Sequence, residues 1–241
     1  FTGDTVLALD FAQHADAVVL VIGEHPRRSG ENGNVTDLRL PPGQSEFIEA
    51  VVNMGKPVVM VVFAGRPLAI TRQVAQVDAV LYAWHPGIEG GAALGELLFG
   101  LHAPTGRLPV TFPRATGQAP IYYNHKNSGR PVGTDQLFMT RYVDMPTSPL
   151  FPFGYGLGYT TFEYANLRLS HQTLRGQMQI SAEITNTGNT TGSELAQLYV
   201  RDLVGSLTRP VRELKGFQRV ELQPGETRRV TFTLSEDMLA F

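Results

Sequence analysis

The stretch ADAVVLVIGE, residues 15–24, sets the pattern on which the first half of the chain is built. Its apolar run from Ala17 to Ile22 is unbroken, which is typical of a parallel strand covered on both faces. Two further strand-like runs follow, in residues 57–64 and 78–87. Helix-type patterns lie in residues 41–56, 66–77 and 87–100. Strand and helix therefore alternate three times, which predicts an α/β fold with a mainly parallel sheet and helices on its faces.

The loops that follow the strands are the expected place for a ligand site, because ligands of open parallel sheets bind beyond the carboxyl ends of the strands. Three loops should share this edge, in residues 24–37, 64–67 and 84–91. The first contains the polar segment HPRRSGENGNVTD, which begins at His25. Two carboxylates of this region are candidate functional groups, Glu24 at the strand end and Glu31 in the middle of the loop.

Each candidate also has a plainer interpretation. A carboxylate at the position of Glu24 often anchors a loop through backbone amides or a nearby arginine. A glutamate in a polar loop, such as Glu31, is in most proteins simply solvated. Trp84, the single tryptophan, is either a ring at the sheet edge that stacks on a ligand or a core aromatic residue that ends a strand. The residues by themselves leave these alternatives open.

The second half of the chain changes pattern. GRLPVTFP, residues 106–113, resembles one more strand, at an edge because Pro109 cannot donate a ladder hydrogen bond. Residues 114–160 lose periodicity but are rich in aromatics, which predicts a packed linker. Residues 161–241 alternate as short strands with turns, which predicts an all-β sandwich of the immunoglobulin or fibronectin type III kind. We expect the α/β domain, residues 1–113, to lack its first elements and the sandwich to lack its last strands.

Composition excludes several classes of protein. The chain has 241 residues, 42% hydrophobic and 17% charged, as in an ordinary globular protein. A formal net charge of -2 provides no basic field for nucleic acid or an acidic membrane surface, and no apolar stretch approaches the roughly 20 residues that span a bilayer. The chain has no cysteine, and its histidines lack metal-ligand spacing, so we expect neither a metal nor a cofactor. The first residues have the spacing of a helix and lead straight into a strand, as in a fold whose earlier elements are missing, so we expect the chain to be a fragment.

Several segments together resemble the C-terminal part of a glycoside hydrolase family 3 β-glucosidase. They are ADAVVLVIGE, the glutamate-containing loop followed by TDLRLPPGQ, GKPVVMVVFAGRPLAI, AWHPGIEGGAALGELLFG, APTGRLPVTFPR, LFPFGYGLGYTTFEY, ITNTGN and SLTRPVRELKGFQRVELQPGE. Their order and spacing make the resemblance specific, and it covers essentially the whole chain. The resemblance implies an α/β sandwich followed by a fibronectin type III-like domain, with an N-terminal (β/α)8 barrel outside these residues.

The resemblance also implies a function. Family members of this type hydrolyse terminal β-linked glucose in short oligosaccharides or aryl glycosides. The barrel supplies an aspartate nucleophile, and a glutamate of the α/β sandwich, at the place of Glu31, is the general acid/base. A retaining glycosidase needs its two carboxyl groups about 5 to 5.5 Å apart. The chain would therefore hold one half of the catalytic pair and be inactive without its barrel partner. The resemblance further points to a periplasmic or secreted location.

Three residues join Glu31 as expected site residues, in a substrate-binding role: Glu24, Arg28 and Trp84. One departure from the family pattern concerns the charge near them. Where relatives often carry Ser and Arg before the TD pair, this chain has Asn34 and Val35. Arg27 or Arg28 would then supply the missing charge.

A second interpretation belongs to another functional class, a non-catalytic carbohydrate-binding or scaffolding module. It follows from the lack of a nucleophile opposite Glu31 within this sequence. A serine-dependent α/β hydrolase is disfavoured because no G-x-S-x-G elbow is present. Activity on an aryl β-glucoside, measured with and without a barrel, separates the first two interpretations.

Overall fold

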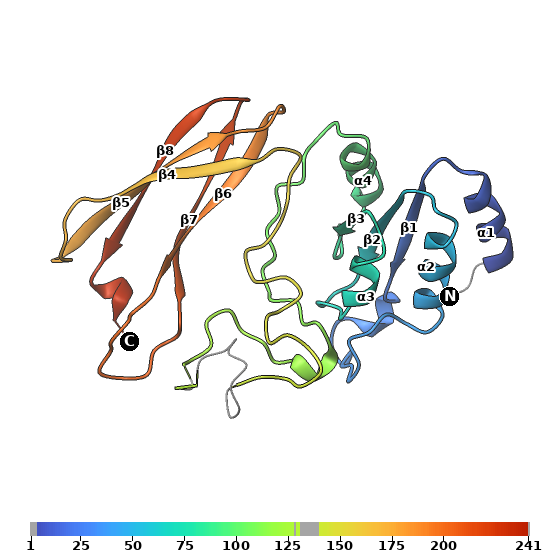
Figure 1. Cartoon of the computed structure of the whole chain (residues 1–241), viewed down its shortest axis with the longest axis horizontal. Coiled ribbons are helices and arrows are strands. Elements are labelled where there is room, and N and C mark those ends of the chain that lie inside the picture. The colour runs from blue at the N-terminus through green and yellow to red at the C-terminus, as the bar shows by residue number, and fades with distance from the viewer. Residues whose placement is uncertain (1–3, 128, 131–139, 241) are drawn as a thin grey trace. The chain divides into compact units, whose positions relative to one another are not determined.

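The apolar runs of the first half form a three-stranded parallel sheet in the computed structural model, which describes residues 4–127, 129–130 and 140–240. The strands lie in the order β1 (Val18–Gly23), β2 (Val58–Phe63) and β3 (Ala79–Tyr82). The helices around them are α1 (Thr5–His14), α2 (Gln44–Val52), α3 (Thr71–Val74) and α4 (Gly90–Leu98). Figure 1 shows their alternation along the chain, and the predicted α/β class is confirmed.

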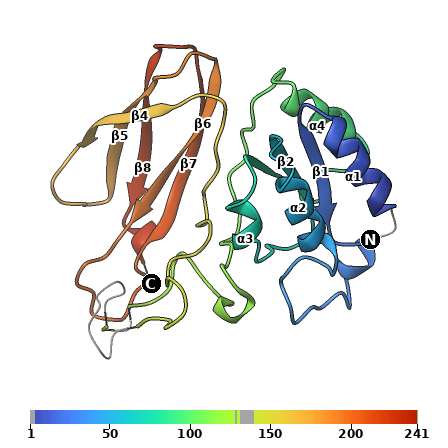
Figure 2. The ribbon, with the colours of Figure 1, turned by 45° about the vertical axis from the view of Figure 1, so that its right-hand side comes forward.

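One face of this sheet carries the core of the α/β part. Alternate residues of β1, Leu20 and Ile22, point to the same side as Met60 and Val62 of β2, because side chains of a strand alternate between its faces. Helix α2 packs Ile48 and Val51 against them, both fully buried. In Figures 1 and 2, β1 and β2 run side by side with α2 next to them. Burial of this apolar surface holds α2 on the sheet.

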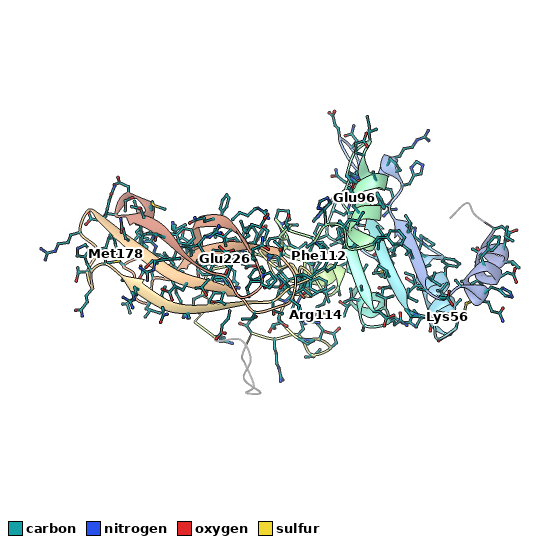
Figure 3. The ribbon with its side chains drawn as sticks, turned by 90° about the horizontal axis from the view of Figure 1, so that it is seen from above. Lys56, Glu96, Phe112, Arg114, Met178 and Glu226 are labelled. Carbon is teal, nitrogen blue, oxygen red and sulfur yellow. The ribbon has the colours of Figure 1, made fainter. Side chains whose placement is uncertain are left out.

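The carboxyl ends of β1 and β2 approach each other closely. Gly23 pairs with Phe63 and has a φ of 138°. A Cβ atom at Gly23 would lie 1.8 Å from the carbonyl oxygen of Phe63, so only glycine fits. Lys56, labelled in Figure 3, precedes β2 and marks the opposite edge of the sheet. The close approach brings together the loops that leave β1 and β2.

The second half forms two antiparallel sheets. One contains β4 (Phe162–Leu169), β5 (Gln177–Asn186) and β8 (Thr227–Ser235), and the other pairs β6 (Gly192–Val200) with β7 (Glu213–Leu222). Ile184 of β5 and Val230 of β8 share a core with Ala196 of β6 and Leu222 of β7, which joins the two sheets. The predicted fibronectin type III-like sandwich is confirmed.

One predicted element is wrong. Residues 106–113 do not form a strand, and Phe112 alone makes an isolated bridge, with Phe151. Pro109 and Pro113 lack the backbone N–H that a ladder needs, so the apolar spacing of this segment is used for packing instead. Phe112 is 1% exposed and contacts Tyr82 and Trp84 edge to face.

The described residues divide into two units. The first contains the chain up to Glu96 together with Thr111–Ile121 and Pro149–Phe151, and the second contains the remainder. The segment predicted as a linker, 114–160, therefore contributes to both units. The predicted boundaries at 113 and 160 stay a prediction. Among the helices of the described residues, none combines the length and apolar character needed to cross a membrane.

Candidate functional site

The first side chain beyond β1 is a buried carboxylate. Glu24 continues the strand pairing, because its backbone N–H donates to the carbonyl oxygen of Phe63 at 2.8 Å. Its side chain is 1% exposed and contacts two guanidinium groups. The Nε of Arg28 donates to Oε1 at 3.0 Å, and the Nε of Arg66 lies 3.0 Å from Oε2. The Arg66 contact is an ion pair without hydrogen-bond alignment. Such pairing compensates the desolvation of the carboxylate.

Arg66 also binds the backbone of the loop that leaves β1. It follows β2, its side chain is 18% exposed, and its Nη2 donates to the carbonyl oxygen of Gly33 at 2.9 Å. The same nitrogen donates to the carbonyl oxygen of Arg28. The phenolic hydroxyl of Tyr82 donates to the carbonyl oxygen of Arg66 at 2.5 Å. Arg66 therefore joins the loop after β1 to the loop after β2.

Glu31 lies in a tight turn between those two loop carbonyls. The N–H of Gly33 donates to the carbonyl oxygen of Gly30 at 3.0 Å. Gly30 and Asn32 both have left-handed backbone, with φ of 99° and 61°. Glycine and asparagine adopt this conformation most readily. Glu31 is exposed, and within the described part of the chain no hydrogen bond or ion pair to its carboxylate is seen.

Trp84 lies at the same edge, just beyond β3. Its φ of 54° lies in the left-handed region, which is unusual for a bulky residue. The indole is half-buried and contacts Tyr82 and Phe112 edge to face, with ring centroids 4.9 and 5.7 Å apart. The ring thus has core contacts, and its role in stacking on a sugar stays a prediction.

Burial shifts the pKa of one group near the loop. The pKa of Tyr82 is raised well above its usual 10.0 because desolvation disfavours the phenolate, and the charge of Glu24 acts in the same direction. The hydroxyl therefore stays protonated and available as a donor to Arg66. Farther along the loop, hydrogen bonds from Arg39 hold the pKa of Asp37 well below its usual range. Asp37 is thereby tied to Arg39 as a loop contact.

A groove of about 930 Å³ lies beside the far end of this loop. It is lined by acidic, basic and hydroxyl side chains, which include Asp37, Arg39, Glu46, Thr71, Arg72 and Thr116. None of the four site residues predicted from the sequence lines it. The described residues also contain no group of three histidine or carboxylate side chains placed to hold a metal ion. The structure brings Glu24 and Arg28 into contact and leaves Glu31 exposed.

These positions bear on the alternatives left by the sequence. The near-complete burial of Glu24 between two guanidinium groups favours the anchoring interpretation over direct contact with substrate. Arg28, one of the two arginines expected to supply the charge missing at Val35, contacts Glu24. Substrate-binding roles for Glu24, Arg28 and Trp84, and a catalytic role for Glu31, stay predictions.

Sequence reasoning did not single out Arg66 or Tyr82. Residues 64–67 were expected at the ligand edge, so the rule that ligands bind beyond strand ends predicts the location of Arg66. It does not predict the hydrogen-bond partners of Arg66, because the bonds to Arg28 and Gly33 depend on how a second loop folds back. A signal that could have found it is an arginine three residues beyond the end of a parallel strand.

Comparison with protein families gives two matches. Residues 4–159 match the Glycosyl hydrolase family 3 C-terminal domain, and residues 194–241 match the Fibronectin type III-like domain. The first match contains the sheet, the loop with Glu31 and the segment that follows. The second begins within β6.

Curated proteins and solved structures give consistent similarities. The chain is 42% identical to a periplasmic beta-glucosidase of Salmonella typhimurium over 238 residues, which are 97% of this chain and 31% of that protein. It is 41% identical to a beta-xylosidase of Formosa agariphila, over 96% of this chain and 32% of that protein. A beta-glucosidase of Listeria innocua in complex with glucose has a TM-score of 0.94 and 38% identity, over 99% of this chain and 34% of its own. The chain thus spans about a third of the length of these relatives.

Proposed function

The chain belongs to glycosyl hydrolase family 3, and from that premise we propose that it supplies, through Glu31, the general acid/base of a retaining β-glucosidase. The observation that carries the proposal is the placement of Glu31, exposed at the tip of a turn at the carboxyl edge of the sheet. The relatives named beta-glucosidase support the substrate class. The beta-xylosidase relative makes the identity of the terminal sugar a separate question for assay.

In the proposed reaction, Glu31 acts twice on protons. Its carboxyl group first donates a proton to the glycosidic oxygen, while a carboxylate nucleophile attacks the anomeric carbon and the leaving alcohol departs. The resulting carboxylate then takes a proton from water, whose oxygen attacks the anomeric carbon and displaces the nucleophile. The sugar leaves with its original configuration after these two inversions. A residue at a turn tip suits this exchange because alcohol must leave and water must enter.

The nucleophile of the proposed reaction lies outside these residues. Near Glu31 the structure places a buried Glu24 that is already paired with Arg28 and Arg66. A carboxylate held in this way is a poor nucleophile for an anomeric carbon, because attack would remove the negative charge with which both guanidinium groups are paired. We infer that an aspartate of a (β/α)8 barrel supplies it, in the two thirds of the relatives' length that this chain does not match. The chain without that region is expected to be inactive.

The proposal is tested by Glu31→Gln in the full-length enzyme. Loss of the proton donor should reduce kcat/KM for alkyl β-glucosides about 10²–10⁴-fold, the usual contribution of general acid catalysis. Aryl glucosides with acidic leaving groups need little protonation, so their first step should slow far less. Added azide should accelerate turnover of the variant and give the glycosyl azide, because an anionic nucleophile needs no general base.

The matched control is Glu221→Gln, which removes an exposed carboxylate on β7. It should keep the parent rates for both classes of substrate. Equal loss for alkyl and aryl glucosides in Glu31→Gln, without an effect of azide, would remove Glu31 from the acid/base role.

A further inference from the structure

One guanidinium group touches the chain on both sides of Glu31. The Nη2 of Arg66 donates to the carbonyl oxygen of Gly33 at 2.9 Å and also to that of Arg28. Arg28 precedes Glu31 by three positions, and Gly33 follows it by two. The backbone on each side of the turn is therefore bound to a single side chain, which belongs to a different loop.

The guanidinium is itself held by rigid elements. Its Nε lies 3.0 Å from Oε2 of Glu24, whose carboxylate is 1% exposed. Glu24 directly follows β1 and its backbone is bonded to Phe63, the last residue of β2. The backbone at Arg66 is fixed in turn by the hydroxyl of Tyr82, at the end of β3. Three neighbouring strands thus determine the position of one guanidinium.

Close packing between the two loops leaves little freedom. A Cβ atom at Gly65 would lie 2.6 Å from Oγ of Ser29 and 2.8 Å from Nε2 of His85. A Cβ atom at Gly33 would lie 2.9 Å from the carbonyl oxygen of Arg28. All three distances are shorter than ordinary contacts, so a side chain added at either glycine would force the neighbouring atoms of the loop to shift.

We propose that Arg66 is the positioning residue of the acid/base turn: it fixes the place of the Glu31 carboxyl group without contacting the substrate. This inference rests on the proposed function of Glu31. Proton transfer depends steeply on placement, and a displacement of about 1 Å can reduce a rate about 10²-fold. A planar guanidinium can bind two carbonyl oxygens and a carboxylate at once, whereas the single ammonium group of lysine cannot reproduce that geometry.

Arg66→Lys in the full-length enzyme tests the inference, because it keeps the positive charge opposite Glu24 and removes the planar guanidinium group that binds the two carbonyl oxygens. We expect kcat/KM for alkyl glucosides to fall about 10 to 100-fold more than for aryl glucosides with acidic leaving groups. KM for the aryl substrates should stay within about twofold, because proton transfer contributes little to their binding. The matched control is Arg72→Lys, an exposed arginine paired with Glu49, which should behave as the parent enzyme.

A double-mutant cycle separates positioning from general destabilisation. If Arg66 acts through Glu31, then Arg66→Lys should cost little further activity on alkyl glucosides once Glu31→Gln is in place. Additive losses, or equal loss on all substrates in Arg66→Lys, would overturn the inference. If Glu31→Gln itself lacks leaving-group dependence, the proposed function fails first. If only Arg66→Lys lacks it, the inference alone fails.

Gly65→Ala provides a second perturbation should Arg66→Lys not fold. It retains the guanidinium and pushes on Ser29 and His85 across the loop contact. A folded Gly65→Ala enzyme should show the same selective loss on alkyl glucosides. A normal leaving-group dependence in that variant, with the melting temperature unchanged, would count against positioning by this contact.

Discussion

A single hydroxyl group can hold a loop in place when it binds the backbone of that loop, and Tyr82 is such a case. Its oxygen donates to the carbonyl oxygen of Arg66 at 2.5 Å and accepts from the N–H of Leu68 at 3.2 Å. Leu68 is fully buried, so water cannot replace this contact easily. The hydroxyl therefore satisfies two backbone groups of the loop that carries Arg66.

Tyr82→Phe should lower the free energy of unfolding by about 1–3 kcal/mol, because a buried N–H and a C=O lose their partner. Chemical denaturation measures the change, with Tyr122→Phe, at an exposed side chain, as control.

The raised pKa of Tyr82 also predicts that stability depends on pH. Above pH 10 the unfolded chain releases the phenol proton while the folded chain keeps it, so stability decreases as pH rises. This part of the alkaline decrease should be absent in Tyr82→Phe; an unchanged profile would contradict it.

At the residue scale, the sequence could place the loop but not its contacts. The apolar run before Gly23 predicts a buried strand, and the strand-end rule then puts Glu24 and Glu31 at a ligand edge. The ion pairs of Glu24 could not be predicted in the same way, because Arg66 is 42 positions away and reaches Glu24 only through the register of β1 with β2. The contacts of a long side chain depend on the three-dimensional fold, and the periodicity of the sequence does not predict them.

At the scale of elements, the end of β5 is fixed by a buried amide. Asn186 is 0% exposed, and its Nδ2 donates to the carbonyl oxygens of Thr190 and Leu222 at 2.8 and 2.9 Å. Its Oδ1 accepts from the hydroxyl of Thr160 and the N–H of Gly188. The amide thus joins β5, the turn after it, the end of β7 and the residues before β4. The sequence NTGN, residues 186–189, predicts a turn but not these contacts of the amide.

Asn186→Ala should destabilise the sandwich by on the order of 3 kcal/mol, since several buried backbone groups lose their partners together. Thermal unfolding followed by circular dichroism measures the effect. Asn189→Ala, an exposed residue of the same turn, is the matched control and should stay within about 0.5 kcal/mol of the parent. Similar values for both variants would show that the amide contributes no more than a surface residue.

Strands with strong alternation or unbroken apolar runs were predicted correctly, and segments rich in proline were not. β5 buries Met178, Ile180 and Ile184 on one face, as period-two spacing predicts. Residues 106–113 have similar apolar content, but two prolines remove the donors that a ladder requires. Only the four residues of α3 are helical within the predicted helix of residues 66–77, because residues 66–70 belong to the loop that precedes it.

At the scale of the whole molecule, the described residues contain separate cores. The core of the sheet joins Ile48 and Val51 to β1 and β2, whereas that of the sandwich joins Ile184 to Leu222 and Val230. Family resemblance predicted this order of α/β part and sandwich. The sharing of residues 97–152 between the two units could not be predicted, because the segment has no regular periodicity from residue 114 on.

Ile48→Ala should lower the stability of the α/β unit by about 2–5 kcal/mol, since it leaves a cavity at a fully buried site. Hydrogen exchange should accelerate at the amides of β1 and β2 and stay unchanged at those of β5 and β8. Ile88→Ala, at a fully exposed side chain, is the control. Equal acceleration in both units would show that they unfold as one cooperative body.

The single tryptophan of the sequence provides an optical probe of the ligand edge. Trp84 follows β3 and is half-buried against Tyr82 and Phe112, so its emission reports the polarity around these rings. In the chain by itself, selective excitation of indole gives a signal from this one position, free of other tryptophans. Quenching by a soluble collisional agent would then measure how open the edge is, without any label attached to the protein.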